Sequence, residues 1–328
     1  MKQRIITGLI FFLVLVPLLV VDALLPVFEV VAAILACAGA WEMINLFSHE
    51  KKCPLSVKIV VILSTLFVFM SGMTLWEPFK AEIALNPNSP NIITYLIFDT
   101  KLSYALLIGA LVLQLSLLVF VKDFDAKDIG KSIATSIYVG IGMASLLALR
   151  LMGIRFIVYL FMITWSTDVF AYFFGMLFGK HKMIERISPK KTWEGAIGGT
   201  LVATVMGTLY AFLYGKLFTG ALNPGDLNTI FDTFIVTGVD THPIGLFILI
   251  FVVTLLTSIA GQLGDLVASR LKRTYDVKDY SNIFPGHGGV LDRFDSSIFA
   301  SMVLLALFLC VLDGFIAFLY FGIVGVYY

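Results

Sequence analysis

Long apolar runs separated by short polar links dominate the sequence. Nine of these runs approach or exceed the roughly 20 helical residues that cross a hydrocarbon core of about 30 Å. They lie at residues 5–21, 25–47, 57–76, 103–121, 132–149, 156–178, 196–218, 244–264 and 296–326. The pattern predicts an all-α, polytopic integral membrane protein with about nine transmembrane helices. The fifth run is the weakest, because Gly140 and Gly142 interrupt it.

The composition supports a membrane protein and excludes several other classes. The 328 residues are 59% hydrophobic and only 14% charged, with a mean hydropathy of +0.96, which no ordinary soluble domain reaches. The formal net charge is +1 and the basic residues form no long tract, so a nucleic-acid partner is not expected. Cys37, Cys53 and Cys310 have no zinc-binding or CxxC spacing, so they predict no disulfide framework.

The distribution of lysine and arginine predicts the orientation of the chain. With nine spans, 18 of the 23 basic residues fall on the side of the N-terminus. Because positive residues flanking the spans are retained inside, the N-terminus is expected to be cytoplasmic. The first run follows Lys2 and Arg4, as in a signal peptide, but the short link into the next run predicts a retained helix. The protein is thus expected in the cytoplasmic membrane.

The two halves of the chain differ in their polar content. Residues 1–150 have few polar residues within their spans and are predicted to be scaffold helices. Whether these helices also form homodimer contacts stays open. Residues 151–328 carry polar residues within and beside their spans, and are predicted to be the catalytic region, with cytoplasmic loops at 179–195 and 265–295. We find no internal repeat and no soluble domain.

The segment from Asp265 to Asp295 concentrates the charge of the chain. It holds five carboxylates and five fixed cations between long apolar runs. Asp265 is expected to end the eighth run at the membrane surface. Asp292 and Asp295 are three residues apart, so they share a face if a helix begins near Asp292, and such hard oxygen ligands suit Mg²⁺.

Two further features of this segment point to a phosphate-bearing ligand. Lys272, Arg273 and Lys278 would neutralise phosphates. The turn at residues 285–289 is rich in glycine, whose missing Cβ atoms let backbone amides approach a ligand closely.

In order and spacing, this segment resembles the signature of the phosphatidate cytidylyltransferases, also called CDP-diacylglycerol synthases. The matching residues are Ser269, Leu271, Lys272, Arg273, Lys278, Asp279, Ser281, Phe284, Pro285, His287, Gly288, Gly289, Val290, Asp292, Arg293, Phe294 and Asp295. A second region resembles the same family at Trp165-Ser166-Thr167-Asp168, Ala171-Tyr172, Gly175, Gly179-Lys180 and residues 188–195. The N-terminal half resembles the family only in its general apolar character.

The resemblance implies a Mg²⁺-dependent transferase with CTP and phosphatidate as substrates, working among membrane lipids. It implies catalytic roles for Asp265, Lys272, Asp292 and Asp295, and metal binding by the three aspartates of that set. Together with the chemistry of the loops, it implies substrate contacts from Asp168, Ser188, Lys190, Lys191, Ser269, Arg273, Lys278, Asp279, His287, Gly288, Gly289 and Arg293. The product would be CDP-diacylglycerol, with release of pyrophosphate.

Several of these residues have a simpler explanation. Asp168 lies within an apolar run, where an ionised side chain costs about 2.5–3.5 kcal/mol, so it faces a wet cavity or pairs with a neighbouring helix. The 188–195 loop, with Ser188 as an N-cap, is either a triphosphate clamp or an ordinary positive-inside signal, and the loop alone favours the signal. Glu194 is a base contact or a helix-start carboxylate. His287 shapes the turn or contacts phosphate.

Two other functions fit parts of the pattern. A related membrane transferase acting on another lipid phosphate would need much of the same charged segment. A polytopic transporter would also bury a carboxylate such as Asp168, but it would not need a basic, glycine-rich surface loop with paired aspartates.

Overall fold

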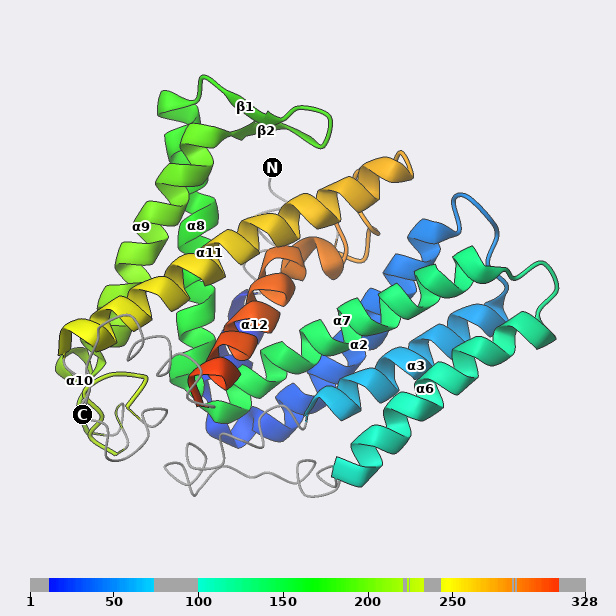
Figure 1. Cartoon of the computed structure of the whole chain (residues 1–328), viewed down its shortest axis with the longest axis horizontal. Coiled ribbons are helices and arrows are strands. Elements are labelled where there is room, and N and C mark those ends of the chain that lie inside the picture. Colours follow the sequence, from blue (N-terminus) through cyan, green and yellow to red (C-terminus); the bar gives the residue numbers. More distant parts are fainter. Residues whose placement is uncertain are drawn as a thin grey trace, which may run out of the picture. The chain divides into compact units, whose positions relative to one another are not determined.

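The computed structural model describes residues 12–73, 100–220, 223, 225–232, 243–284, 286 and 288–312, and most of these are helical (Figure 1). Among these described residues, eight helices are long and apolar enough to cross a membrane, at Asp22–Phe47, Leu55–Gly72, Lys101–Phe120, Ala126–Met152, Ile154–Phe178, Trp193–Phe212, Pro243–Thr274 and Leu291–Cys310. The prediction of an all-α polytopic membrane protein is confirmed. Residues 5–11 of the first predicted run lie outside the described residues, and residues 12–20 of it are helical.

Helix α7 (Ala126–Met152) contains the run that the sequence makes weakest, yet it is continuous and the most buried of the eight. A Cβ atom on Gly140 would lie 2.8 Å from Val68, and one on Gly142 would lie 2.2 Å from Ile298. These glycines therefore mark close packing of helices and not a break in the span.

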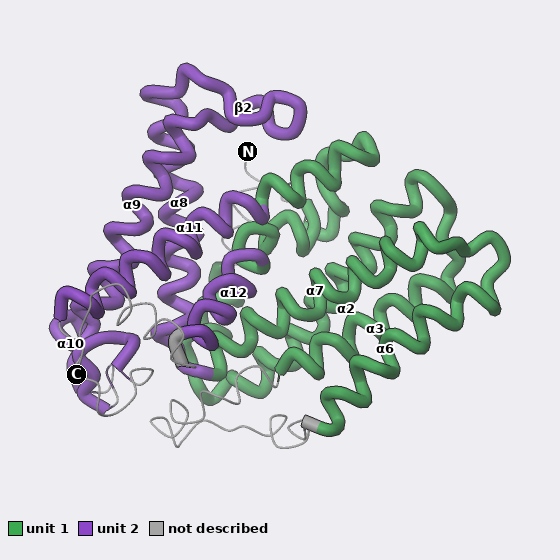
Figure 2. The backbone as a smooth tube through the Cα atoms, viewed as in Figure 1, with its two compact units in different colours: residues 1–77, 88–151, 265–298 green, residues 78–87, 152–264, 299–328 purple. Residues whose placement is uncertain are grey.

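The chain folds into two compact units (Figure 2). Unit 1 comprises residues 1–77, 88–151 and 265–298, and unit 2 comprises residues 78–87, 152–264 and 299–328. Helices α11 (Pro243–Thr274) and α12 (Leu291–Leu312) contribute residues to both units.

Unit 1 is built on helices that run side by side in Figure 1. The short 3-10 helix η1 (Asp22–Leu24) leads into α2 (Leu25–Phe47), followed by α3 (Leu55–Gly72), α6 (Thr100–Phe120) and α7. Helix α3 packs against both α2 and α6. A buried hydroxyl on α7, Ser136 Oγ, accepts hydrogen bonds from Gln114 Nε2 of α6 at 2.7 Å and from Thr65 Oγ1 of α3 at 3.3 Å.

Unit 2 is organised by the close pairing of α8 (Ile154–Phe178) with α9 (Trp193–Phe212). The two backbones approach because α9 presents glycines, and a Cβ atom on Gly199 would lie 2.5 Å from the carbonyl oxygen of Thr167. The chain segment that connects α8 to α9 contains β1 (Lys182–Ile184) and β2 (Ser188–Thr192). These strands form an antiparallel hairpin that the sequence did not predict. The short α10 (Tyr214–Leu217) follows α9.

Candidate active site

The charged segment begins within helix α11. Asp265 follows the apolar part of this helix, but the helix itself does not end there and continues to Thr274. The expected loop at residues 265–295 is therefore helical as far as residue 274 and again from residue 291. Good helix formers fill this extension, and Lys272 and Arg273 lie in the last turn, where cations interact favourably with the helix dipole. The irregular part, residues 275–290, is called the signature loop below.

Asp292 lies in the first turn of α12 and holds both ends of the signature loop. Its Oδ1 accepts a hydrogen bond from Lys272 Nζ at 2.7 Å, and its Oδ2 accepts from the backbone amides of Tyr280 at 2.8 Å and Gly289 at 2.9 Å. The side chains of Asp292 and Lys272 are only 3% and 11% exposed. Both carboxylate oxygens of this predicted metal ligand are thus engaged by donors of the protein itself.

Glu42 of α2 is a second carboxylate that holds the loop, and it was missed by the sequence analysis. Its side chain is fully buried. Oε1 accepts from Ser281 Oγ at 2.6 Å and from the amide of Val290 at 2.8 Å, while Oε2 accepts from the amide of Leu291 at 2.9 Å. A charged residue inside the apolar run 25–47 was the available signal. We call Glu42 and Asp292 together the carboxylate clamp.

The glycines of the signature loop make room for the carboxylate clamp. Gly288 has a φ of +84°, and a Cβ atom there would lie 2.7 Å from Asp292 Oδ2. A Cβ atom on Gly289 would lie 2.4 Å from Glu42 Oε1. Phe284 and Gly288 form an antiparallel bridge across the predicted turn. His287 and Pro285 lie outside the described residues.

Asp265 and Asp295 share a neighbour, Tyr138 of α7. Both carboxylates interact electrostatically with its hydroxyl group. The Tyr138 hydroxyl is buried and, within the part of the chain that the structure describes, has no hydrogen-bond partner. Asp295 Oδ1 accepts from the amide of Ser296 at 2.8 Å, and Asp265 Oδ1 accepts from Ser269 Oγ at 3.3 Å.

The donor set near Tyr138 bears directly on the expected metal. The predicted set of three aspartates is not assembled, since no group of three His, Cys, Asp or Glu side chains able to hold a metal occurs among the described residues. Two carboxylates remain, Asp265 and Asp295. They fit Mg²⁺, which is commonly bound through one or two carboxylates with substrate phosphates and water completing its shell.

The remaining candidate residues of unit 1 lie mostly on its surface. Arg273 is exposed and donates from Nη1 to the carbonyl oxygen of Val277 at 3.1 Å. Lys278, Asp279 and Arg293 are also exposed, so they are accessible to a soluble ligand.

Lys272 is mostly buried and lies 5.1 Å from the ring centroid of Tyr280. Burial raises the pKa of the Tyr280 phenol, so it stays protonated at neutral pH.

The other candidate residues belong to unit 2. Asp168 is exposed on α8, and Lys190 is exposed on β2 beside the half-buried Lys191. Ser188 lies in β2, so its prediction as an N-cap is wrong. Thr192 caps α9 instead, accepting from the amide of Gly195 at 3.2 Å.

Glu194 lies in the first turn of α9, as the helix-start interpretation requires. It accepts from the backbone amide of His181 at 3.2 Å, and it contacts His181 Nδ1 at 2.6 Å. The candidate residues thus fall into two sets, one in each unit.

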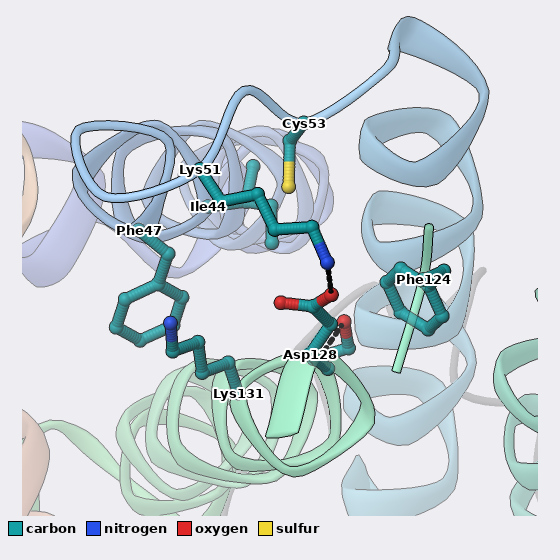
Figure 3. Close-up of a pocket in the computed structure, with 8 residues that line it drawn as sticks. Ile44, Phe47, Lys51, Cys53, Phe124, Asp128 and Lys131 are labelled. Carbon is teal, nitrogen blue, oxygen red and sulfur yellow. Dashed lines mark hydrogen bonds and ion pairs between the residues drawn. The ribbon is translucent and has the colours of Figure 1, made fainter. Parts of the chain in front are cut away.

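A pocket in unit 1 contains none of the predicted site residues (Figure 3). It is lined by Ile44, Phe47, Lys51, Cys53, Phe124, Asp128, Lys131 and Ser132. Lys51 Nζ reaches Asp128 Oδ2 at 2.5 Å across it (Figure 3), so its principal charges are already paired.

Comparison with known proteins establishes the class of this chain. Residues 2–311 match the Cytidylyltransferase family, and the chain belongs to that family. It is therefore an enzyme of the nucleotidyltransferase class. The match gives no support to the transporter alternative.

Individual relatives carry a more particular description. The chain is 33% identical over 318 residues to the phosphatidate cytidylyltransferase of Bacillus subtilis (strain 168), covering 94% of this chain and 98% of that protein. It is 39% identical over 176 residues to the protein of the same name from Staphylococcus haemolyticus (strain JCSC1435) and 40% identical to that of Staphylococcus aureus (strain COL). Each of these two alignments covers 54% of this chain and 57% of the relative.

Replacing Asp292 by Asn should destabilise the fold. The change leaves the ammonium of Lys272 buried without its counter-charge, which typically costs about 3–5 kcal/mol of unfolding free energy. Thermal or denaturant unfolding in detergent measures the effect. Asp276→Asn is the matched control, because Asp276 is exposed and its φ of +53° is well tolerated by Asn. Equal stability of Asp292→Asn and the parent would contradict the structural role.

Proposed function

We propose that this chain transfers the cytidylyl group of CTP to phosphatidate, giving CDP-diacylglycerol and pyrophosphate. The observation that carries the proposal is the alignment with a phosphatidate cytidylyltransferase along almost the whole of both chains. The charged segment inside that alignment supports it, because a membrane enzyme that joins a nucleotide to a lipid needs both cations and carboxylates beside its spans.

In this reaction a phosphate oxygen of phosphatidate attacks the α-phosphorus of CTP. The bond from the α-phosphorus to the bridging oxygen breaks, and pyrophosphate leaves with the electron pair. No covalent enzyme intermediate is needed, so catalysis consists of positioning and charge neutralisation. The exposed Arg273, Lys278 and Arg293 offer cations for the triphosphate. Lys190 and Lys191 of the hairpin offer two more.

Asp265 and Asp295 are the residues of this chain that would hold Mg²⁺. When bound, the ion would neutralise charge on the phosphates during transfer. Asp292 has a different role, because Lys272 and two backbone amides occupy its oxygens. It holds the signature loop against α12, and thereby positions Arg293 beside it.

The candidate site faces the cytoplasm in this proposal. The asymmetry of lysine and arginine supports that orientation, and CTP is a soluble nucleotide that arrives from water. The phosphatidate head group reaches the same surface while its acyl chains stay in the hydrocarbon core.

Purified protein in detergent should release pyrophosphate only when CTP and phosphatidate are both present. Omitting each substrate in turn, and replacing phosphatidate with another lipid phosphate such as a polyprenyl phosphate, separates this reaction from that of a related transferase. Pyrophosphate release with the substitute lipid but not with phosphatidate would reject the proposed substrate.

Asp295→Asn should fold normally but need much more Mg²⁺ and lose activity by about 100-fold, because charge neutralisation at the phosphates weakens. Titrating Mg²⁺ against the rate of pyrophosphate release measures the shift. Asp276→Asn should keep the parent's Mg²⁺ dependence. An Asp295→Asn protein with the parent's rate and Mg²⁺ requirement would remove Asp295 from the metal site.

The orientation can be tested with single cysteines in a background of Cys37→Ala, Cys53→Ser and Cys310→Ala. Asn282→Cys should be shielded from an impermeant thiol reagent in intact cells, and Asn228→Cys should be labelled. Both positions are exposed on the folded chain, so protection reports the side of the membrane. Labelling of Asn282→Cys from outside would reverse the proposed orientation.

A further inference from the structure

Helix α2 contacts the signature loop and the first residue of α12 at successive points along its length. A Cβ atom on Gly39 would lie 3.1 Å from Leu291 Cδ2, so the two segments pack tightly there. Glu42, about one turn further on, accepts the hydrogen bonds of Ser281, Val290 and Leu291. The ring centroids of Phe47 and Tyr275 lie 5.5 Å apart. The N-terminal half of the chain is thus part of the surroundings of the site.

The chemistry of Glu42 requires a carboxylate and not merely a polar group of similar size. Oε1 accepts two donors and Oε2 accepts a third, and no solvent reaches the side chain. Glutamine could keep the two donors on its carbonyl oxygen, but its NH₂ group would then face the amide of Leu291, which is also a donor. The negative charge of Glu42 also lies at the N-terminus of α12, where the helix dipole favours it.

We propose that Glu42 is a positioning residue for cytidylyl transfer, acting through the signature loop and the first turn of α12. The proposal rests on the proposed function. Because its side chain is fully buried, Glu42 acts through the protein and not by contacting substrate. It fixes the backbone directly before Asp292 and Arg293, and so the placement of Lys278 and Arg293, whose charges contribute to charge neutralisation. Gly289 is needed at its position because Glu42 Oε1 occupies the space of a side chain there.

Glu42→Gln is the direct test, with Glu29→Gln as its matched control. Glu29 lies on the same helix and is only 2% exposed, but neither of its oxygens has a hydrogen-bond partner among the described residues. Assayed well below its unfolding temperature, Glu42→Gln should lose about tenfold or more in kcat, because Lys278 and Arg293 are misplaced. The KM for CTP should change by less than about threefold, and Glu29→Gln should stay within about twofold of the parent.

A second readout does not depend on activity. Amide hydrogen exchange, followed by mass spectrometry in detergent, should be faster across residues 280–291 in Glu42→Gln and unchanged there in Glu29→Gln. If the parent makes no CDP-diacylglycerol but exchange still accelerates, the proposed function fails while the structural contact stands. If exchange accelerates and kcat does not fall, or if Glu29→Gln loses as much activity as Glu42→Gln, the positioning role is wrong.

Ser281→Ala provides an independent variant, because it removes one donor and leaves the carboxylate in place. It should lower kcat in the parent and have little further effect in Glu42→Gln, since both changes act through one contact. If Glu42→Gln does not fold, Ser281→Ala alone carries the test. Unchanged exchange and kcat in that variant would overturn the proposal.

Discussion

The local structure of the candidate site depends on the burial of two carboxylates beside the first turn of α12. Removing a carboxylate from water costs several kcal/mol unless donors and counter-charge replace the lost hydration. The carboxylate clamp meets this requirement with six donors, of which four are backbone amides. The irregular loop before α12 therefore has a specified conformation, because any other arrangement would leave Glu42 or Asp292 buried without partners.

The same segment contains carboxylates in two different environments. Asp292 accepts hydrogen bonds from Lys272 and two backbone amides, whereas Asp265 and Asp295 lie near a tyrosine hydroxyl that lacks a partner in the described structure. The first environment holds the loop in place, and the second is the one proposed to hold the ion. A negative charge at these three positions thus serves two physical purposes. Loss of the charge at Asp292 affects the conformation of the loop, whereas loss of the charge at Asp265 or Asp295 affects the proposed ion site.

Much of the fold could be predicted from sequence, because apolar runs of membrane length are a strong and local pattern. The extension of α11 to Thr274 was not predicted, since polar residues continue that helix after its apolar run ends. For the site, the charged segment was located correctly by its residue types. The roles within it were not separable, because Asp292 and Asp295 look alike until Lys272 is seen beside only one of them. Glu42 was missed because its partners are 239 to 249 positions away.

That separation has a consequence for the biogenesis of the protein. At about 5–20 residues per second, the ribosome needs on the order of ten to fifty seconds to make the chain between Glu42 and Leu291. Throughout this interval the carboxyl group of Glu42 exists in a nascent helix without its eventual donors. The clamp can close only after α12 begins to emerge, so the site is among the last parts of unit 1 to mature. Quality control that samples exposed polar groups within the membrane would therefore encounter α2 for much of the time that the chain is being synthesised.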